Sequence, residues 1–364
     1  MRTPSRLLVL TALAALTAVG ARAEDTTLNV YNWSDYIHED TVPMFEDEFG
    51  IDVSYDVYSS NEVLEGKLMA GNSGYDVVVP SASFLRRQIE AGIYQKLDKT
   101  KLDNWDNLDN AVLKRVQQFD PGNQYSVPYM WGTTGIGYNP ELVEKHIDGE
   151  PPTNSWELLF NPKYTKQLQD CGIALLDSPT ETLEHVRNYL GLGQNSSDPA
   201  DLQKAVKRLQ EIRPHVRYFD NAKYIDDLAN GEICAAMGWS GDVYLARDRA
   251  AAKGDHTVTY AIPEEGTLMW FDVMAIPKDA ADVEAAHAFL DFMLRPEIAA
   301  QNVNYVWYPS ATAAAKPHIK DAILDNPAIY PPERVMEKLY VDADRSNTFA
   351  RKETRAWQKV KTGY

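Results

Sequence analysis

Cysteine and histidine are scarce in this sequence. Its 364 residues include only two cysteines, Cys171 and Cys234, and seven histidines scattered between His38 and His318. The histidines match no zinc-binding motif, and two isolated cysteines have no metal-ligand spacing. The sequence therefore predicts no metal site, no cofactor and no catalytic cysteine.

Long apolar stretches are missing beyond the N-terminus. The run from Leu7 to Gly20 is too short to span a bilayer comfortably, and no later stretch has about 18 consecutive apolar residues. Arg2 and Arg6 precede this run, and the A-x-A site Ala21-Arg22-Ala23 follows it, which is typical of a secretory signal peptide. No cysteine follows the run, which argues against a lipid anchor. We expect cleavage after Ala23 and a soluble, exported mature protein.

Basic residues are outnumbered by acidic ones. The chain has 36 Lys and Arg against 53 Asp and Glu, a formal charge of -17, and removing three arginines with the signal peptide makes it -20. Such a surface repels nucleic acid and favours cationic ligands, although solubility alone also explains most of it. Because the chain is exported, its two cysteines predict one disulfide. The loop of about 60 residues that it closes would stabilise the fold by roughly 4 kcal/mol.

Strand and helix patterns alternate over the first hundred mature residues. Alternating or continuous apolar runs predict strands, and apolar faces that end at Gly50, Gly71 and Gly92 predict helices. The order of these elements implies an open, mostly parallel sheet covered by helices. The predicted strands are 28–31, 51–57 and 77–79, and the predicted helices are 41–49, 61–70 and 84–91.

A second unit of the same character follows. Its predicted strands are 172–176, 216–219 and 233–237, and its helices are 181–190, 205–212 and 224–230. The glycine- and aromatic-rich segment 127–138 is interpreted as a crossing between two lobes. A crossing back is expected at 257–263, followed by a strand at 268–276, a helix at 284–294 and a third crossing near 305–309.

Aromatic and acidic side chains lie on or just after the predicted strands. In open α/β sheets, ligands bind beyond the carboxyl ends of the strands, so these positions are candidates for a site. Three times a tryptophan precedes an aspartate by two or three residues. The segments are Trp33-Ser34-Asp35-Tyr36, Pro80-Ser81, Asp177 to Glu181, Trp239-Ser240-Gly241-Asp242 and Trp270-Phe271-Asp272.

Such pairs suit an alkyl ammonium. A carboxylate accepts charge-assisted hydrogen bonds from the ammonium group, and an aromatic face attracts the cation by roughly 0.5–2 kcal/mol. The same rings cover the methylene groups between the charged ends. Carboxylates from both lobes would grip both ends of the ligand.

Each candidate also has a purely structural explanation. Ser178 to Glu181 fits a capping box with proline at the first helical position, and Ser81 fits a helix cap. Asp35 and Asp242 fit loop or turn chemistry. Asp272 is hardest to explain in this way, because acids are uncommon in a strand as apolar as 268–276. The aromatic candidates that fit core or hinge packing are Trp33, Trp270 and Tyr308.

Enzyme motifs fit the sequence poorly. The run Gly238-Trp239-Ser240-Gly241-Asp242 misses the nucleophile elbow, because Asp242 replaces the last glycine. The glycines from Gly132 to Gly137 lack the strand–helix setting of a phosphate loop, and no Walker sequence occurs. We therefore predict that the protein is not an enzyme.

The same segments resemble the periplasmic polyamine-binding proteins of the putrescine/spermidine type, which serve ABC importers. The similarity extends over essentially the whole mature chain. Its most specific segments are 30–36 (VYNWSDY), 60–71 (SNEVLEGKLMAG), 79–85 (VPSASFL), 128–139 (PYMWGTTGIGYN) and 224–242, which ends in GWSGD.

The resemblance implies the type II two-lobed fold of periplasmic binding proteins. In this α/β fold each lobe has a mostly parallel sheet flanked by helices, and the crossing segments form a hinge beside a ligand cleft. The implied boundaries place 24–133 and 260–307 in lobe 1, and 134–259 and 308–364 in lobe 2.

The resemblance also implies a binding site, a disulfide and partners. Cys171 and Cys234 match the disulfide pair of the family. The implied partners are a small-molecule polyamine and a membrane permease–ATPase complex, with no nucleic acid, and the expected form is a monomer. The residues that match the binding positions are Trp33, Ser34, Asp35, Tyr36, Ser81, Glu181, Trp239, Asp242, Trp270, Asp272 and Tyr308.

One position departs from the pattern. Putrescine-preferring members of the family tend to carry Phe where Trp270 stands, and tryptophan there is similar to the spermidine-preferring members. Asp35 and Asp242 instead look like the putrescine pattern. The preferred polyamine is therefore undecided, with a slight lean towards spermidine.

Two other functions stay open from the sequence. A binding protein for an amino acid would need an arginine for the ligand carboxylate, and none of the clusters contains one; a sugar is a further option. An exported hydrolase would use a pair of carboxylates for glycoside cleavage. A binding screen across solute classes and a turnover assay separate these alternatives.

Overall fold

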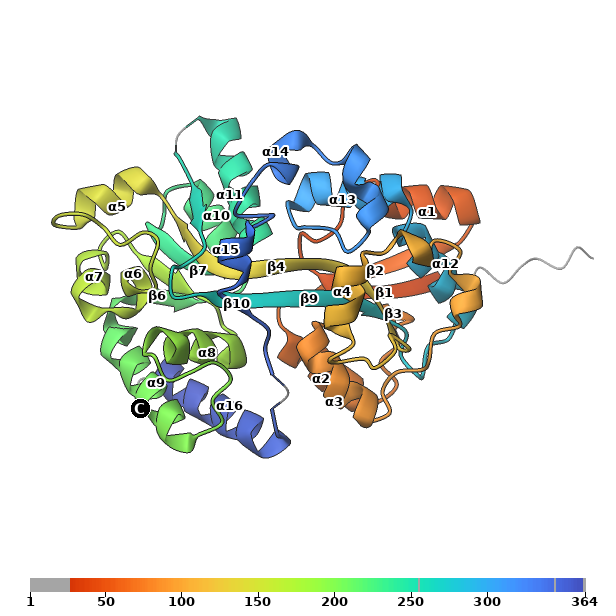
Figure 1. Cartoon of the computed structure of the whole chain (residues 1–364), viewed down its shortest axis with the longest axis horizontal. Helices are drawn as coiled ribbons and strands as arrows, with labels where there is room; N and C mark the ends of the chain where they lie inside the picture. The colour runs from red at the N-terminus through yellow and green to blue at the C-terminus, as the bar shows by residue number, and fades with distance from the viewer. Residues whose placement is uncertain (1–26, 255, 344, 363–364) are drawn as a thin grey trace, which may run out of the picture.

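The chain folds into two α/β lobes that share one mixed sheet (Figure 1). The computed structural model describes residues 27–254, 256–343 and 345–362, so the predicted signal peptide and its cleavage site lie outside the described residues. Within those ranges, no helix combines the length and the apolar composition that a membrane span requires.

Three parallel strands form the sheet of the first lobe. β1 (Thr27–Trp33) lies between β2 (Asp52–Tyr58) and β3 (Val77–Val78). The intervening helices are α1 (Thr41–Phe49), α2 (Asn61–Met69) and α3 (Ala82–Glu90). The predicted elements of this lobe are confirmed, with shifts of at most two residues at their ends. Gly50 ends α1 in the left-handed conformation, with φ at 65°.

The second lobe repeats this arrangement. β5 (Ile173–Leu175) lies between β6 (Val216–Phe219) and β7 (Ala235–Trp239), and all three strands are parallel. The helices that follow these strands are α8 (Pro179–Tyr189), α9 (Pro199–Ile212), α10 (Lys223–Ala229) and α11 (Ser240–Lys253). The existence of α8, α9 and α10 agrees with the sequence prediction, although α9 begins six residues earlier than 205, whereas α11 was not predicted.

Two long antiparallel strands connect the lobes at the centre of Figure 1. The first half of β4 (Ser126–Tyr138) pairs with β9 (Thr267–Ala275), and its second half pairs with β7 and with β8 (Thr259–Ala261). The far end of β9 reaches β3, and its beginning pairs with β10 (Leu339–Tyr340). The predicted crossing at 127–138 is thus confirmed.

The predicted crossing back at 257–263 is wrong. That segment contains β8, which pairs only with the second-lobe end of β4, and the chain turns at Gly266 before β9 crosses instead. The physical reason is that β9 is the more buried strand. Eight of its nine residues are buried, as expected for a strand that is packed on both faces where it runs from one lobe to the other. The lobe boundaries near 133, 260 and 307 stay a prediction, since the sheet runs through both lobes without a break.

The remaining helices cover the two faces of the sheet. The last helix, α16, packs against α8 and α9, so the end of the chain returns to the second lobe (Figure 1). These helices are α4 (Asn110–Val116), α5 (Pro140–His146), α6 (Glu157–Phe160), α7 (Pro162–Gln167), α12 (Val283–Met293), α13 (Pro296–Val306), α14 (Asp321–Leu324), α15 (Glu333–Met336) and α16 (Asn347–Thr362).

The predicted disulfide is confirmed. Cys171 and Cys234 lie just before β5 and β7 and are bonded, with their Cα atoms 5.6 Å apart. Because these strands are neighbours in the sheet, the disulfide fastens two adjacent chain segments at one edge of the second lobe.

A buried ionic network holds the C-terminal helix to the second lobe. Arg187 of α8 donates hydrogen bonds to Glu184 at 2.7 Å and to Glu353 of α16 at 2.9 Å, and all three side chains are fully buried or nearly so. Arg345 bonds Glu184 at 2.9 Å and also Asp342. Each buried charge therefore has an opposite partner, as burial requires.

Candidate functional site

One cavity between the lobes collects ten of the eleven residues that the sequence indicated. Its walls come from the ends of β1, β3 and β7, from the middle of β9 and from the starts of α3, α8 and α11. The ten residues are Trp33, Ser34, Tyr36, Ser81, Glu181, Trp239, Asp242, Trp270, Asp272 and Tyr308. Since the strands of both lobes direct their carboxyl ends here, the cavity lies where an open α/β sheet binds its ligand.

Asp272 is a buried carboxylate on β9. Ser81 donates a hydrogen bond to one of its oxygens at 2.6 Å, and Tyr36 donates to the other at 2.9 Å. Burial raises the pKa of Asp272 to about 7, although both hydroxyl donors oppose this shift. The hydroxyl of Ser81 makes no helix-cap bond, so the capping explanation for Ser81 does not hold.

Asp242 lies in the first turn of α11. Its carboxylate accepts hydrogen bonds from the hydroxyl groups of Tyr224 and Tyr308, both at 2.7 Å. Burial raises the pKa of Asp242 to about 6, against the effect of these two donors. Gly241 is required beside it, because a Cβ atom there would lie 2.5 Å from the Tyr308 ring. The carboxylate is therefore fixed by packing and is not part of a simple turn.

Glu181 lies in the first turn of α8. Its carboxylate accepts hydrogen bonds from the Thr134 hydroxyl and from the indole nitrogen of Trp239 at 3.1 Å. It does not bond the backbone of Ser178, which has no side-chain cap bond either, so the capping-box explanation fails. Burial raises the pKa of Glu181 to about 7, with contributions from neighbouring carboxylates.

Three tryptophans line the cavity. The Trp33 indole is held by a 2.9 Å hydrogen bond to the Val79 carbonyl, and its ring meets Trp239 edge-on at 5.7 Å, across the two lobes. Trp270 contacts Tyr308 at 5.1 Å. Gly132 makes room for the Trp270 ring, because a Cβ atom there would lie 2.5 Å from it. The rings thus cover the space between the carboxylates with apolar surface.

Asp35 lies outside the cavity. It has a left-handed backbone, with φ at 53°, and its carboxylate accepts a hydrogen bond from Arg249 of α11 at 2.9 Å. Arg249 also pairs with Asp226 at 3.0 Å. Asp35 is therefore placed at a bridge between the lobes and not among the residues that line the cavity.

Asp342 is a fourth carboxylate in the cavity wall, which the sequence analysis missed. It follows β10, a two-residue strand with no recognisable sequence pattern, and reaches the cavity because β10 pairs with β9 beside Trp270. Arg345 donates hydrogen bonds to both of its oxygens. Glu62 of α2 lies near this region as well, and burial raises its pKa to about 7. No local signal identifies either residue.

The charges of the cavity have one sign. Its lining, taken from the described residues, contains four carboxylates and no lysine, arginine or histidine. The pKa values of Asp242, Asp272 and Glu181 are raised mainly by burial, which disfavours the ionised form of each carboxylate. A bound cation would relieve this cost, and an anion or an α-carboxylate would find no basic partner.

The nucleophile-elbow resemblance has no support in the geometry. Ser240 is the first residue of α11 and is buried, and its hydroxyl oxygen accepts a hydrogen bond from the backbone of Thr133. The cavity lining includes neither Ser240 nor a histidine that would act as its base.

The fold and the enclosed cavity between lobes define a two-lobed solute-binding protein. Residues 41–331 match the family model of the bacterial extracellular solute-binding proteins, and the chain belongs to this family. Close relatives are solute-binding transport proteins and not enzymes.

Three known proteins illustrate the similarity. The chain is 50% identical over 358 residues to the putrescine-binding periplasmic protein SpuD of Pseudomonas aeruginosa, and the aligned region covers 98% of each chain. It is 48% identical over 358 residues to the putrescine-binding periplasmic protein PotF of Escherichia coli, covering 98% of this chain and 97% of PotF. A Listeria monocytogenes structure assigned to a spermidine/putrescine ABC transporter has a TM-score of 0.84 at 32% identity, covering 93% of this chain and 100% of that chain.

Proposed function

We propose that this protein captures a polyamine in the cavity between its lobes, as the periplasmic binding component of an ABC importer. The observation that carries the proposal is a cavity whose described lining has four carboxylates and three tryptophans but no lysine, arginine or histidine. The proteins most similar to it that are described above are named for putrescine or spermidine. The ligand class is thus supported both by the acidic lining of the cavity and by the similar proteins.

In this proposal the ligand is held by two acidic regions. Asp272 accepts a hydrogen bond from Tyr36 and Asp242 accepts one from Tyr308, and the two tyrosine rings are in contact. These two carboxylates receive one ammonium group. Glu181, with Asp342 nearby, receives the other end. The tryptophans attract the ammonium groups and cover the methylenes between them. Because the ligand touches both lobes, its binding energy favours the closed arrangement.

Export and delivery complete the proposal. Residues 1–23 act as the signal peptide, with cleavage after Ala23, and the mature protein works in the periplasm as a monomer. The closed form then docks on a membrane permease–ATPase complex and releases its polyamine there. The strongly acidic surface excludes nucleic acid as a partner.

Calorimetry with putrescine and spermidine at moderate salt tests the proposal. We expect saturable binding of at least one of them, with glutamate and a neutral disaccharide as control solutes that do not bind. Dissociation constants weaker than about 1 mM for both polyamines, which is about 4 kcal/mol of binding free energy, would reject it. The same titrations rank the two polyamines.

Polyamine affinity is expected to fall at least about tenfold when the pH is lowered from about 7.5 to about 5. Burial raises the pKa of Asp272 and Glu181 to about 7 and that of Asp242 to about 6, so protons occupy these carboxyls at the lower pH. A bound cation favours the ionised forms, and binding must therefore expel those protons. Dissociation constants at several pH values, and proton release measured in buffers of different ionisation enthalpy, check this.

The stability of the ligand-free protein should show the opposite trend. The folded pKa values of these carboxyls lie above the ordinary values near 4, so their contribution to stability is most favourable at low pH and is lost as the pH rises through about 7.

For the binding prediction, a polyamine dissociation constant that does not change over this pH range would contradict the assignment of these groups to the site.

Replacing Arg249 by glutamine is expected to weaken polyamine binding by no more than about fivefold. The Asp35–Arg249 pair is partly exposed, and such pairs contribute about 1 kcal/mol or less. Asp35→Asn should have the same small effect, and the double variant should lose no more than either single variant. A much larger loss for Asp35→Asn alone would instead assign Asp35 to direct contact with the ligand. Fluorescence or calorimetric titration of the three variants decides.

A further inference from the structure

Three possible metal ligands meet at the disulfide of the second lobe. His146 is the last residue of α5, and its ring nitrogen and the sulfur atoms of Cys171 and Cys234 all lie within 4.8 Å of one another. Their spacing in the sequence gave no hint of this arrangement. The fold brings them together because α5 follows β4, which pairs with the strand that follows Cys234.

The His146 ring is oriented as a metal ligand would be. Its Nδ1 atom lies 2.8 Å from the carbonyl oxygen of Leu142, and a carbonyl can only accept, so Nδ1 carries the proton. The Nε2 atom is therefore left with a free lone pair. The Asn139 side chain caps α5 by accepting a hydrogen bond from the Leu142 backbone at 2.9 Å, which fixes the register of the helix. A backbone carbonyl behind the ring is the usual partner of a metal-bound histidine.

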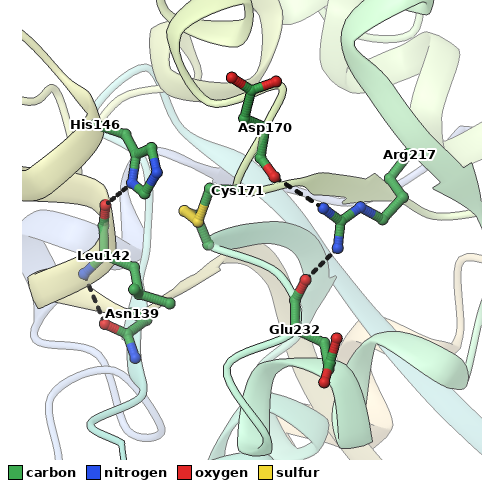
Figure 2. The surroundings of a disulfide bond; sticks show 8 residues. Asn139, Leu142, His146, Asp170, Cys171, Arg217 and Glu232 are labelled. Atoms are coloured by element: carbon green, nitrogen blue, oxygen red, sulfur yellow. Dashed lines mark hydrogen bonds between the residues drawn. A yellow bond between two sulfur atoms is a disulfide. The ribbon is translucent and has the colours of Figure 1, made fainter.

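Hydrogen bonds join the segments around the cysteines in addition to the disulfide. The backbone of Asn139 donates to the Cys234 carbonyl at 2.8 Å, and the backbone of Cys234 donates to the Gly172 carbonyl at 2.8 Å. Arg217 joins the same two segments from the other side, because its guanidinium bonds the carbonyls of Asp170, at 3.1 Å, and Glu232 (Figure 2). We expect these bonds to keep the cysteine-bearing segments close when the sulfur–sulfur bond is broken.

We infer that the reduced protein has a zinc site made of Cys171, Cys234 and His146. A phosphine reductant gives two electrons to the disulfide and becomes the phosphine oxide by taking oxygen from one water molecule, whose two protons complete the two thiols. Zinc then displaces the two thiol protons, and the Nε2 lone pair of His146 supplies the third bond. Two thiolates and one imidazole suit a four-coordinate Zn²⁺ ion whose fourth position is filled by water.

The site is reachable and separate from the polyamine cavity. His146 and Cys171 are half-buried, whereas Cys234 is buried, so an ion enters from the side of α5. α5 lies at the outer end of the second lobe, and the junction of β4 and β9 lies at the centre of the molecule (Figure 1). Reduction would thus replace a disulfide by a metal ion at the end of the second lobe that lies away from the cavity.

The test uses the mature protein, reduced with a phosphine without oxygen and freed of reductant. Cobalt(II), a coloured substitute for zinc, should give thiolate-to-cobalt charge-transfer absorption, with one ion bound per reduced chain and none per oxidised chain. Zinc should displace it. His146→Ala should weaken zinc binding at least about tenfold, as loss of a ligand or of its support does. His215→Ala, which removes a half-buried histidine of the same lobe, should change nothing.

Three results would overturn the inference. The first is reduced protein that binds no cobalt, and the second is equal zinc affinity in His146→Ala and the unmodified chain. The third is unfolding on reduction, seen by circular dichroism, because the scaffold is expected to hold without the disulfide. Polyamine binding by the reduced protein provides an independent check that the second lobe remains intact.

Discussion

Asparagine in place of Asp272 is expected to weaken polyamine binding by at least about 1.5 kcal/mol, which is more than tenfold in the dissociation constant. The carboxylate is only 5% exposed and is held by Ser81 and Tyr36 at the wall of the cavity. An amide cannot neutralise an ammonium group, and its NH₂ group would face one of the two hydroxyl groups that now donate to the carboxylate. Calorimetric titration of putrescine and spermidine against the variant measures the loss.

The same variant should not lose stability when no ligand is present. Burial raises the pKa of Asp272 to about 7, which means that the ionised carboxylate is unfavourable in the folded protein. Its removal should leave the free energy of unfolding unchanged or higher at neutral pH. Asp106→Asn, at an exposed position of the same lobe, is the matched control and should bind normally. Unchanged affinity in Asp272→Asn would remove this residue from the site.

Replacing Arg187 by methionine should have the largest effect on stability, a loss of about 3–5 kcal/mol in the free energy of unfolding. Its fully buried guanidinium bonds Glu184 and Glu353, and the variant would leave Arg345 as the remaining cationic partner of these carboxylates among the described residues. Burial acts to raise the pKa of Glu184, but Arg187 and Arg345 outweigh it and lower that pKa. Urea denaturation, extrapolated to zero denaturant, measures the loss.

An exposed ion pair provides the control for this prediction. Arg295 pairs with Glu48 on the surface of the first lobe at 2.7 Å, and Arg295→Met should cost far less because water screens that pair. In the unmodified protein, the contribution of Glu184 is present above its ordinary pKa and is lost as the pH falls through its lower folded value. A loss below about 1 kcal/mol for Arg187→Met would show that the buried carboxylates of Glu184 and Glu353 do not need Arg187 for stability.

Much of the fold could be predicted from local patterns. The strands and helices of both lobes follow from apolar periodicity and from glycines such as Gly50, because these signals act within one turn or one strand. The crossing at 257–263 was wrong, since the pattern there does not differ from that of any short strand, and the helix α11 was not predicted. The length and burial of β9 are decided by the two lobes that pack around it.

The candidate site could be predicted in part for a similar reason. Residues that follow parallel strands gather at one edge of a sheet, so Trp33, Ser81 and Trp239 were found without knowledge of the packing. Asp342 was not found, because it depends on a two-residue strand far along the chain that pairs with β9. Whether Glu181 caps α8 or faces the cavity was also undecided until Thr134 and Trp239 were seen beside it.

The sequence by itself predicted export, and it determined an acidic α/β chain with aromatic–acidic pairs at strand ends and one disulfide. Only the tertiary structure decided that the carboxylates of Asp242, Asp272, Glu181 and Asp342 lie in one enclosed space, that Asp35 pairs with Arg249 outside it, and that His146 lies beside the disulfide. The physical reason is the separation along the chain over which each interaction acts. Periodicity and turn chemistry act between neighbours in the chain, whereas burial and charge pairing depend on atoms that meet only when distant strands cross.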